Sequence, residues 1–147
     1  MDIRIGVEYD EDIQRALDKL RAREFQAGRY NPVLPFPDFS EPVFSTQRPG
    51  AAHSSIDAAI EAAAEDGTRS ILDIGSVGPE ADYGVAAPIP TAELIQLFGS
   101  THPSRSDLDR ALTSLLALVA RGQCAYVVAY EPDDRPTWIW FGGYSFD

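Results

Sequence analysis

Apolar and polar positions recur along this chain at the spacings of both strands and helices. Residues 3–7 alternate between apolar side chains and Arg or Gly, which is the two-residue period of a strand with one buried face. Asp10 follows and can cap a helix over residues 11–27, because the apolar positions of this segment fall on one stripe and Gly28 comes after it. The chain is therefore expected to begin with a strand and an amphipathic helix.

Three more helices are expected downstream, over residues 55–66, 91–98 and 106–121. Each begins at a Ser or Thr whose side chain can accept a hydrogen bond from the first turn, and each is followed by a glycine, a residue that often ends a helix. The last begins with Ser106 and Asp109, which are spaced as in a capping box. Its leucines continue at helical spacing, so this segment carries the clearest helical pattern.

Strands are expected over residues 70–74 and, in segments rich in β-branched and aromatic residues, over 124–130 and 137–141. The last two are joined by residues 131–136, a connector rich in Pro and Asp that is typical of a turn, and they form a C-terminal β-hairpin. The earlier strands are separated by helices. We therefore expect an α+β fold with a mixed or mainly antiparallel sheet, packed on one face against about three to four helices.

Residues 29–53 have no periodic pattern and are expected to form one long loop. Prolines recur through the segment and disfavour both a helix interior and a central strand. Loops of this length are uncommon in compact domains and are usually functional, packed or disordered. Aromatic residues, among them Tyr30, Phe36 and Phe39, argue against a free tether.

The length of 147 residues and the 44% of hydrophobic residues predict a single domain over residues 1–147 with a core of its own. The single cysteine, Cys124, lies in an apolar strand and is expected to be buried packing rather than a nucleophile. With no disulfide pair, secretory leader or membrane-length apolar run, a cytoplasmic location is expected. Lys19 is the only lysine beside many arginines and alanines, which is typical of a GC-rich bacterial genome.

The chain is strongly acidic, with 23 acidic and 12 basic residues and a formal charge of −11 at pH 7. A field of this sign repels phosphate backbones, so nucleic acid is not an expected partner. The same field attracts cations or a basic protein surface. The alternative is that the charge only keeps the protein soluble.

Few residues indicate catalysis. His53 ends the long loop just before a helix, where an imidazole could act as acid or base with Asp73 or Tyr144 assisting. The favoured interpretation is a partly exposed loop histidine that supports the cap of this helix. Residues 72–78 place an acid and two glycines after a strand, but two more acids follow, so a nucleotide-binding turn is not expected. No metal site is expected, because no ligand set has the spacing that zinc sites use, and no cofactor is expected either.

Aromatic residues of the hairpin and the loop form the candidate binding surface, which consists of Tyr30, Phe36, Phe39, Trp138, Trp140 and Tyr144. Trp138 and Trp140 share one face of their strand and the apolar residues between them share the other, so both faces need cover. One interpretation is a hairpin that only supplies core. The other is that one face or its rim forms a pocket or a partner surface.

These observations leave three functional hypotheses. The favoured one is a non-catalytic protein-binding module that engages a basic partner, as an immunity protein or antitoxin engages a toxin. The alternative is a small enzyme or small-ligand-binding protein with a pocket between residues 29–53 and the hairpin. The third is a structural role in a homo-oligomer joined through a hairpin face or a free strand edge, so a monomer or small homo-oligomer is expected.

Overall fold

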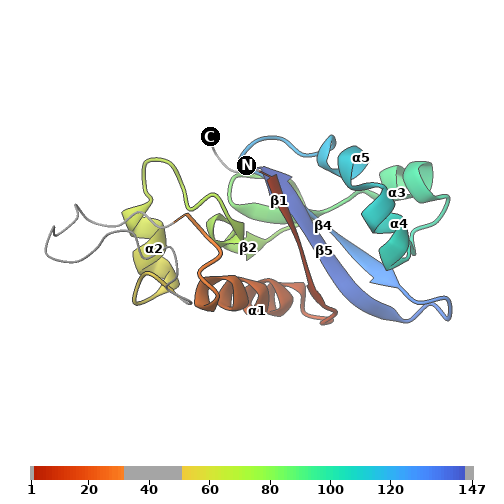
Figure 1. Ribbon diagram of the computed structural model, residues 1–147. Coiled ribbons are helices and arrows are strands. Elements are labelled where there is room, and N and C mark those ends of the chain that lie inside the picture. Colours follow the sequence, from red (N-terminus) through yellow and green to blue (C-terminus); the bar gives the residue numbers. More distant parts are fainter. Residues whose placement is uncertain (1, 32–50, 145–147) are drawn as a thin grey trace, which may run out of the picture.

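A computed structural model describes residues 2–31 and 51–144 of the chain and confirms the expected α+β fold (Figure 1). The strands are β1 (Asp2–Glu8), β2 (Ser76–Val77), β3 (Val85–Pro88), β4 (Cys124–Tyr130) and β5 (Pro136–Tyr144). The helices are α1 (Ile13–Gln26), α2 (Ile56–Ala62), α3 (Thr91–Phe98), α4 (Arg105–Arg110) and α5 (Leu112–Leu116), with a short 3-10 helix, η1 (Ile71–Asp73).

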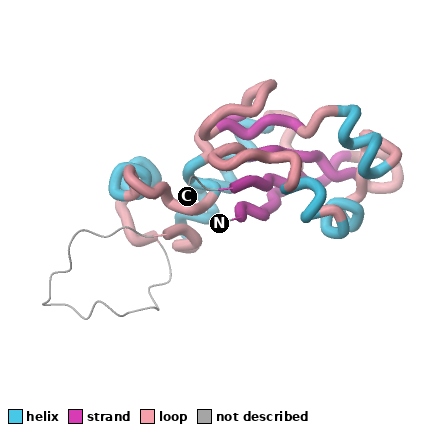
Figure 2. The backbone as a smooth tube through the Cα atoms, turned by 90° about the horizontal axis from the view of Figure 1, so that it is seen from above, coloured by secondary structure: helices cyan, strands magenta, loops and turns pink. Residues whose placement is uncertain are grey.

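The strands form one mixed sheet in the order β1-β5-β4-β3-β2. β5 lies between β1 and β4 and is antiparallel to both, which confirms the expected C-terminal hairpin. β4, β3 and β2 run parallel to one another. Both views show α2 beyond one end of the sheet, away from the β4–β5 turn (Figures 1 and 2).

The two faces of the sheet are buried against different helices. On one face, Ile139 and Phe141 of β5 belong to a core cluster with Leu17 and Leu20 of α1. On the other face, Trp140 clusters with residues of α4 and α5, and α3 packs against the same cluster. The expectation that helices would cover one face only is therefore wrong. Successive residues of β5 point to opposite faces and are apolar in both directions, so each face needs its own cover.

The start of α1 differs in detail from the expectation. Asp12, and not Asp10, is the N-cap, since its side chain accepts a hydrogen bond from the Arg15 amide. The helix ends at Gln26, and Gly28 follows in the left-handed backbone conformation with a φ of 71°, as the sequence pattern predicts.

The segment 70–74, expected to be a strand, contains the 3-10 helix η1 (Ile71–Asp73) instead. The Ser70 hydroxyl oxygen accepts a hydrogen bond from the Leu72 amide, and the Asp73 carboxylate accepts hydrogen bonds from the amides of Thr68 and Arg69. Side chains of Ser and Asp that bond to nearby backbone in this way compete with sheet formation. The strand next to β4 in the sheet is β3, which follows residues 70–74 in the chain.

The helix expected over residues 106–121 has its N-cap at Ser104, two residues before the expected Ser106, and it is split. Ser104 and Asp107 form the capping box, with each side chain accepting a hydrogen bond from the other's amide. Ala111 separates α4 from α5 at a φ of −104° and a ψ of 12°. This break raises the number of α-helices in the described part of the chain to five.

A buried carboxylate holds the end of α1. Glu24 is only 3% exposed and accepts hydrogen bonds from the guanidinium groups of Arg23 and Arg29, with a distance of 3.0 Å from Arg29 Nη2 to Glu24 Oε1. Burial alone would raise the pKa of Glu24, but these hydrogen bonds outweigh it and hold the pKa below its usual range. The ionised carboxylate therefore links α1 to the segment that follows it.

Replacing this carboxylate tests that link. We expect Glu24→Gln to lower the free energy of unfolding by about 1–3 kcal/mol, because charge-assisted hydrogen bonds are replaced and a buried polar group loses partners. Urea denaturation at neutral pH measures the change. The control Glu61→Gln alters an exposed residue of α2 and should stay within about 0.5 kcal/mol. Equal effects of the two substitutions would contradict a structural role for Glu24.

Close backbone approach at Gly143 fixes the pairing of β5 with β4. A Cβ atom on Gly143 would lie 2.1 Å from the carbonyl oxygen of Gln123 and 2.9 Å from the Cα of Cys124. Both contacts are with backbone, so no side chain can move aside. At Gly142, on the opposite face, the space is filled by the Trp140 ring.

We therefore expect Gly143→Ala to force the β4–β5 pairing apart and to destabilise the protein by about 1–3 kcal/mol or more. The matched control is Gly75→Ala, since a Cβ on Gly75 meets nothing within 4 Å. Thermal unfolding followed by tryptophan fluorescence compares the two. Similar unfolding temperatures for both variants would show that the close approach is not a constraint.

Candidate functional site

Three residues were candidates for catalysis, His53 as the acid or base and Asp73 or Tyr144 as its helper. They have different neighbours in the structure. His53 Nδ1 lies 2.9 Å from the hydroxyl of Tyr30, which also accepts a hydrogen bond from the Ala52 amide. Asp73 uses both carboxylate oxygens for Thr68 and Arg69, as described for η1. Tyr144 packs with the core cluster on the opposite face of the sheet from the cluster that contains Tyr30. Among the described residues, His53, Asp73 and Tyr144 thus have different neighbours, and these contacts join separate segments of the chain.

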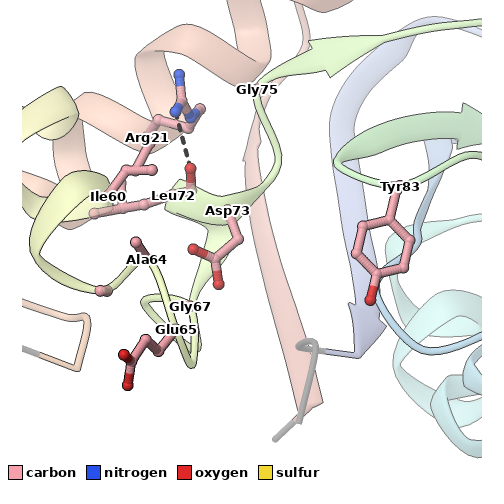
Figure 3. Close-up of a pocket in the computed structure, with 10 residues that line it drawn as sticks. Arg21, Ile60, Ala64, Glu65, Gly67, Leu72, Asp73, Gly75 and Tyr83 are labelled. Carbon is pink, nitrogen blue, oxygen red and sulfur yellow. Dashed lines mark hydrogen bonds between the residues drawn. The ribbon is translucent and has the colours of Figure 1, made fainter.

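Asp73 also lines an open hollow of about 440 Å³ between α2, η1 and the segment that carries Tyr83 (Figure 3). Arg21 reaches it from α1 and donates a hydrogen bond of 2.9 Å to the Leu72 carbonyl oxygen. Burial lowers the pKa of the Arg21 guanidinium. Both oxygens of Asp73 are already engaged, and the other carboxylate that lines the hollow, Glu65, is exposed to solvent.

The predicted binding aromatics fall into three groups. Tyr30 and Trp140 are buried, with exposed fractions of 8% and 5%, and serve the two core clusters. Phe36 and Phe39 lie outside the described residues, so the pocket expected between residues 29–53 and the hairpin stays a prediction. Trp138 and Tyr144 are only partly buried and pack against the same core cluster, and Trp138 also borders a hollow.

The hollow beside Trp138 has a volume of about 450 Å³ and lies between the start of α4 and the β4–β5 turn. Ser104 and Arg105 line it from α4, and Tyr130, Glu131 and Trp138 line it from the hairpin. The Arg105 guanidinium carbon sits 3.7 Å from the centroid of a Trp138 ring, in a cation–π arrangement. An aromatic ring, a cation and a carboxylate thus share one recess.

A stacked pair holds the turn beside this hollow. The rings of His102 and Tyr130 have centroids 3.9 Å apart and are tilted by 19°, and His102 Nδ1 lies 3.2 Å from an oxygen of Asp134. Burial raises the pKa of the Tyr130 hydroxyl, and the nearby Tyr9 and Asp134 add to the effect. The turn is therefore anchored both to the loop before α4 and to the end of β1.

The sheet brings two acidic segments together at this end. The Tyr9 amide donates a hydrogen bond of 3.1 Å to the Thr137 carbonyl oxygen, and Glu8 is the cross-strand partner of Trp138. We call the resulting surface the acidic end, and it consists of Glu8, Asp10, Glu11, Asp12, Glu131, Asp133 and Asp134. Its two segments are separated by more than a hundred residues in sequence and meet only because β1 pairs with β5.

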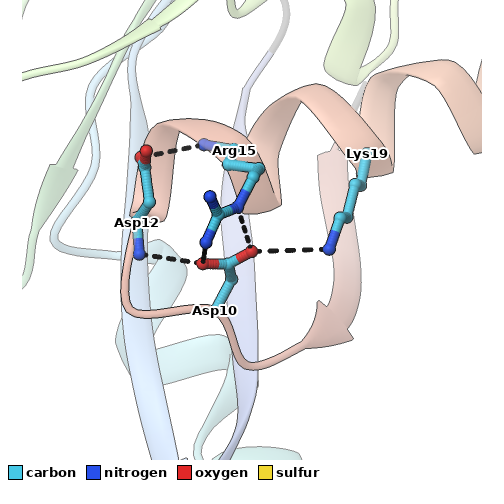
Figure 4. A network of polar contacts seen from close by, with 4 residues as sticks. All are labelled: Asp10, Asp12, Arg15 and Lys19. Carbon is cyan, nitrogen blue, oxygen red and sulfur yellow. Dashed lines mark hydrogen bonds and ion pairs between the residues drawn. The ribbon is translucent and has the colours of Figure 1, made fainter.

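Part of the acidic end is neutralised within the protein. Asp10 accepts hydrogen bonds from the guanidinium group of Arg15, at 2.6 and 2.7 Å, and from Lys19 and the Asp12 amide (Figure 4). Hydrogen bonds from Arg15 and Asp12 hold the pKa of Asp10 well below its usual range. Glu8, Glu11 and Glu131 are exposed instead, and their charges face solvent. Asp133 and Asp134 are exposed as well, but they lie beside Arg135 and His102.

Sequence reasoning identified Trp138 but did not single out Arg105, Glu131 or Glu8 as site residues. The strand pattern could have indicated that Glu8 lies near the hairpin, had the β1–β5 register been known. The position of Arg105 depends on how α4 packs on the sheet, and no spacing along the chain indicates it. The burial of Cys124, in contrast, is confirmed, and it raises the pKa of the thiol to about 12.

The Asp10 network should make stability depend on pH in a defined direction. Because the folded protein lowers the pKa of Asp10, its contribution is fully present above the unfolded value of about 3.9 and is lost as the pH falls below it. We expect Asp10→Asn to be less stable than the wild type at pH 7, with the difference shrinking between about pH 4 and pH 2.

Urea midpoints at several pH values measure this change. Arg15→Gln removes the main hydrogen-bond donor and should reproduce the loss at pH 7. A stability difference that is constant from pH 7 to pH 2 would contradict the proposed coupling.

None of the helices in the described segments has the length and apolar character needed to cross a lipid bilayer. Across residues 2–31 and 51–144, no group of three or more His, Cys, Asp or Glu side chains is placed to hold a metal ion. Comparison with known proteins found no match to the chain among family models, characterised proteins or solved structures.

Proposed function

We propose that this protein is a non-catalytic binding module that engages a basic protein through its acidic end. The observation that carries the proposal is the pairing of β1 with β5, which sets the exposed Glu8 opposite Trp138, near the turn that carries the exposed Glu131. The exposed Glu11 follows Glu8 by three residues. A partner of the immunity or antitoxin target type, a basic toxin in a bacterial cytoplasm, fits this surface chemically.

The physical argument rests on charge and on the structural contacts made by the described residues that were candidates for catalysis. A formal charge of −11 accelerates the encounter with a basic surface at low ionic strength. Tyr130 and Trp138 lie among the carboxylates and supply the aromatic contact area that protein interfaces use. The residues expected to assist catalysis serve as structural hydrogen-bond partners, which favours binding over chemistry.

A capture experiment with matched variants tests this proposal. The acidic-end variant carries Glu8→Gln, Glu11→Gln and Glu131→Gln, three exposed positions of the proposed surface. The control variant carries Glu61→Gln, Glu65→Gln and Glu80→Gln, which remove the same charge from exposed positions elsewhere. We expect the tagged wild type and the control to retain a basic protein at low salt and to release it at high salt.

The acidic-end variant should lose most of that binding, about tenfold or more in affinity, since several charge pairs are removed at once. Equal loss in both variants would show that net charge alone acts, without a defined surface. Recovery of no basic protein at either salt concentration would contradict the proposal.

A further inference from the structure

We propose that the hollow between α4 and the β4–β5 turn receives an arginine side chain of the basic partner, and that Arg105 occupies this place in the free protein. The inference rests on the proposed function and makes it more specific. It names one chemical group of the partner, a guanidinium, and one surface that binds it, the face of Trp138.

The Trp138 ring is held in a fixed position. A Cβ atom on Gly6 would lie 2.1 Å from Trp138 Nε1 and 2.5 Å from Cε2, so the ring lies directly on the backbone of β1. The Arg105 guanidinium lies over a face of this ring, with its carbon 3.7 Å from the ring centroid. A guanidinium group therefore already lies in the hollow, so the binding position exists before a partner arrives.

Arg105 is held by few contacts. It is an exposed residue, and within the described part of the chain its recorded interaction is the one with Trp138. Arg15, Arg29 and Arg110, in contrast, each pair with a carboxylate. A cation–π contact at an exposed position is weak, so an incoming guanidinium can displace Arg105 from the ring.

The charges around the ring select a cation. Glu131 lines the hollow, and Glu8 faces the same side of the sheet as its cross-strand partner Trp138. Two carboxylates disfavour a phosphate or a partner carboxylate at Arg105. They favour a second cation once Arg105 has moved aside. Arginine fits better than lysine, because a planar guanidinium stacks on an aromatic face and is less strongly hydrated than an ammonium group.

Binding of labelled nona-arginine and nona-lysine peptides, followed by fluorescence anisotropy at low salt, tests the inference. If Arg105 competes for the ring, Arg105→Ala should bind nona-arginine about two- to fivefold more tightly than the matched control Arg135→Ala. Arg135 lies in the β4–β5 turn and its side chain is 70% exposed. The control therefore removes the same charge as Arg105→Ala but leaves Arg105 on the Trp138 ring. Nona-lysine should bind the two variants with similar affinity.

Removing the ring provides the second measurement. In the Arg105→Ala background, Trp138→Leu should reduce nona-arginine affinity to that of nona-lysine, with folding checked by circular dichroism. If Arg105→Ala binds nona-arginine no better than Arg135→Ala, the inference that an arginine of the partner binds on the Trp138 ring is wrong. The proposed function is unaffected by that result as long as the acidic-end variant loses binding. If the acidic-end variant binds both peptides as the wild type does, the proposed function fails as well.

Discussion

The double-sided burial of β5 is the constraint on which the rest of the structure depends. Ile139 and Phe141 point to one face and Trp138 and Trp140 to the other, and all four are apolar enough to need cover. The strand can satisfy this only at an interior position of the sheet, between β1 and β4, with helices on both sides. Close approach at Gly143 then fixes its register against β4.

This position of β5 also creates the proposed binding surface. Because β1 pairs with β5, Glu8 at the end of β1 lies opposite Trp138 near the start of β5, close to the acidic β4–β5 turn. Trp140 is buried further along the strand, whereas Trp138, on the same face, is only partly buried and contacts the Arg105 guanidinium. Core formation and the exposed recognition chemistry are thus consequences of one strand.

Charges in this protein fall into two kinds. Glu24 and Asp10 are engaged by arginines and stabilise the two ends of α1, so they cannot serve a partner without cost to the fold. Glu8, Glu11 and Glu131 are exposed and make the acidic end attractive to a cation. Arg105 stands apart from both kinds, since it contacts an indole ring in a chain with abundant carboxylates.

The amino-acid sequence by itself determined the α+β class, the first strand and helix, the terminal hairpin and the burial of Cys124, because periodicity, caps and turn residues are local signals. It failed over residues 70–74 and at the start of α4, where side chains of Ser and Asp choose between nearby backbone partners. Only the tertiary structure decided that Glu8 and Glu131 share one end and that Arg105 covers Trp138. Strand register and helix packing join residues distant in sequence, and those contacts leave no spacing in the chain from which they could be predicted.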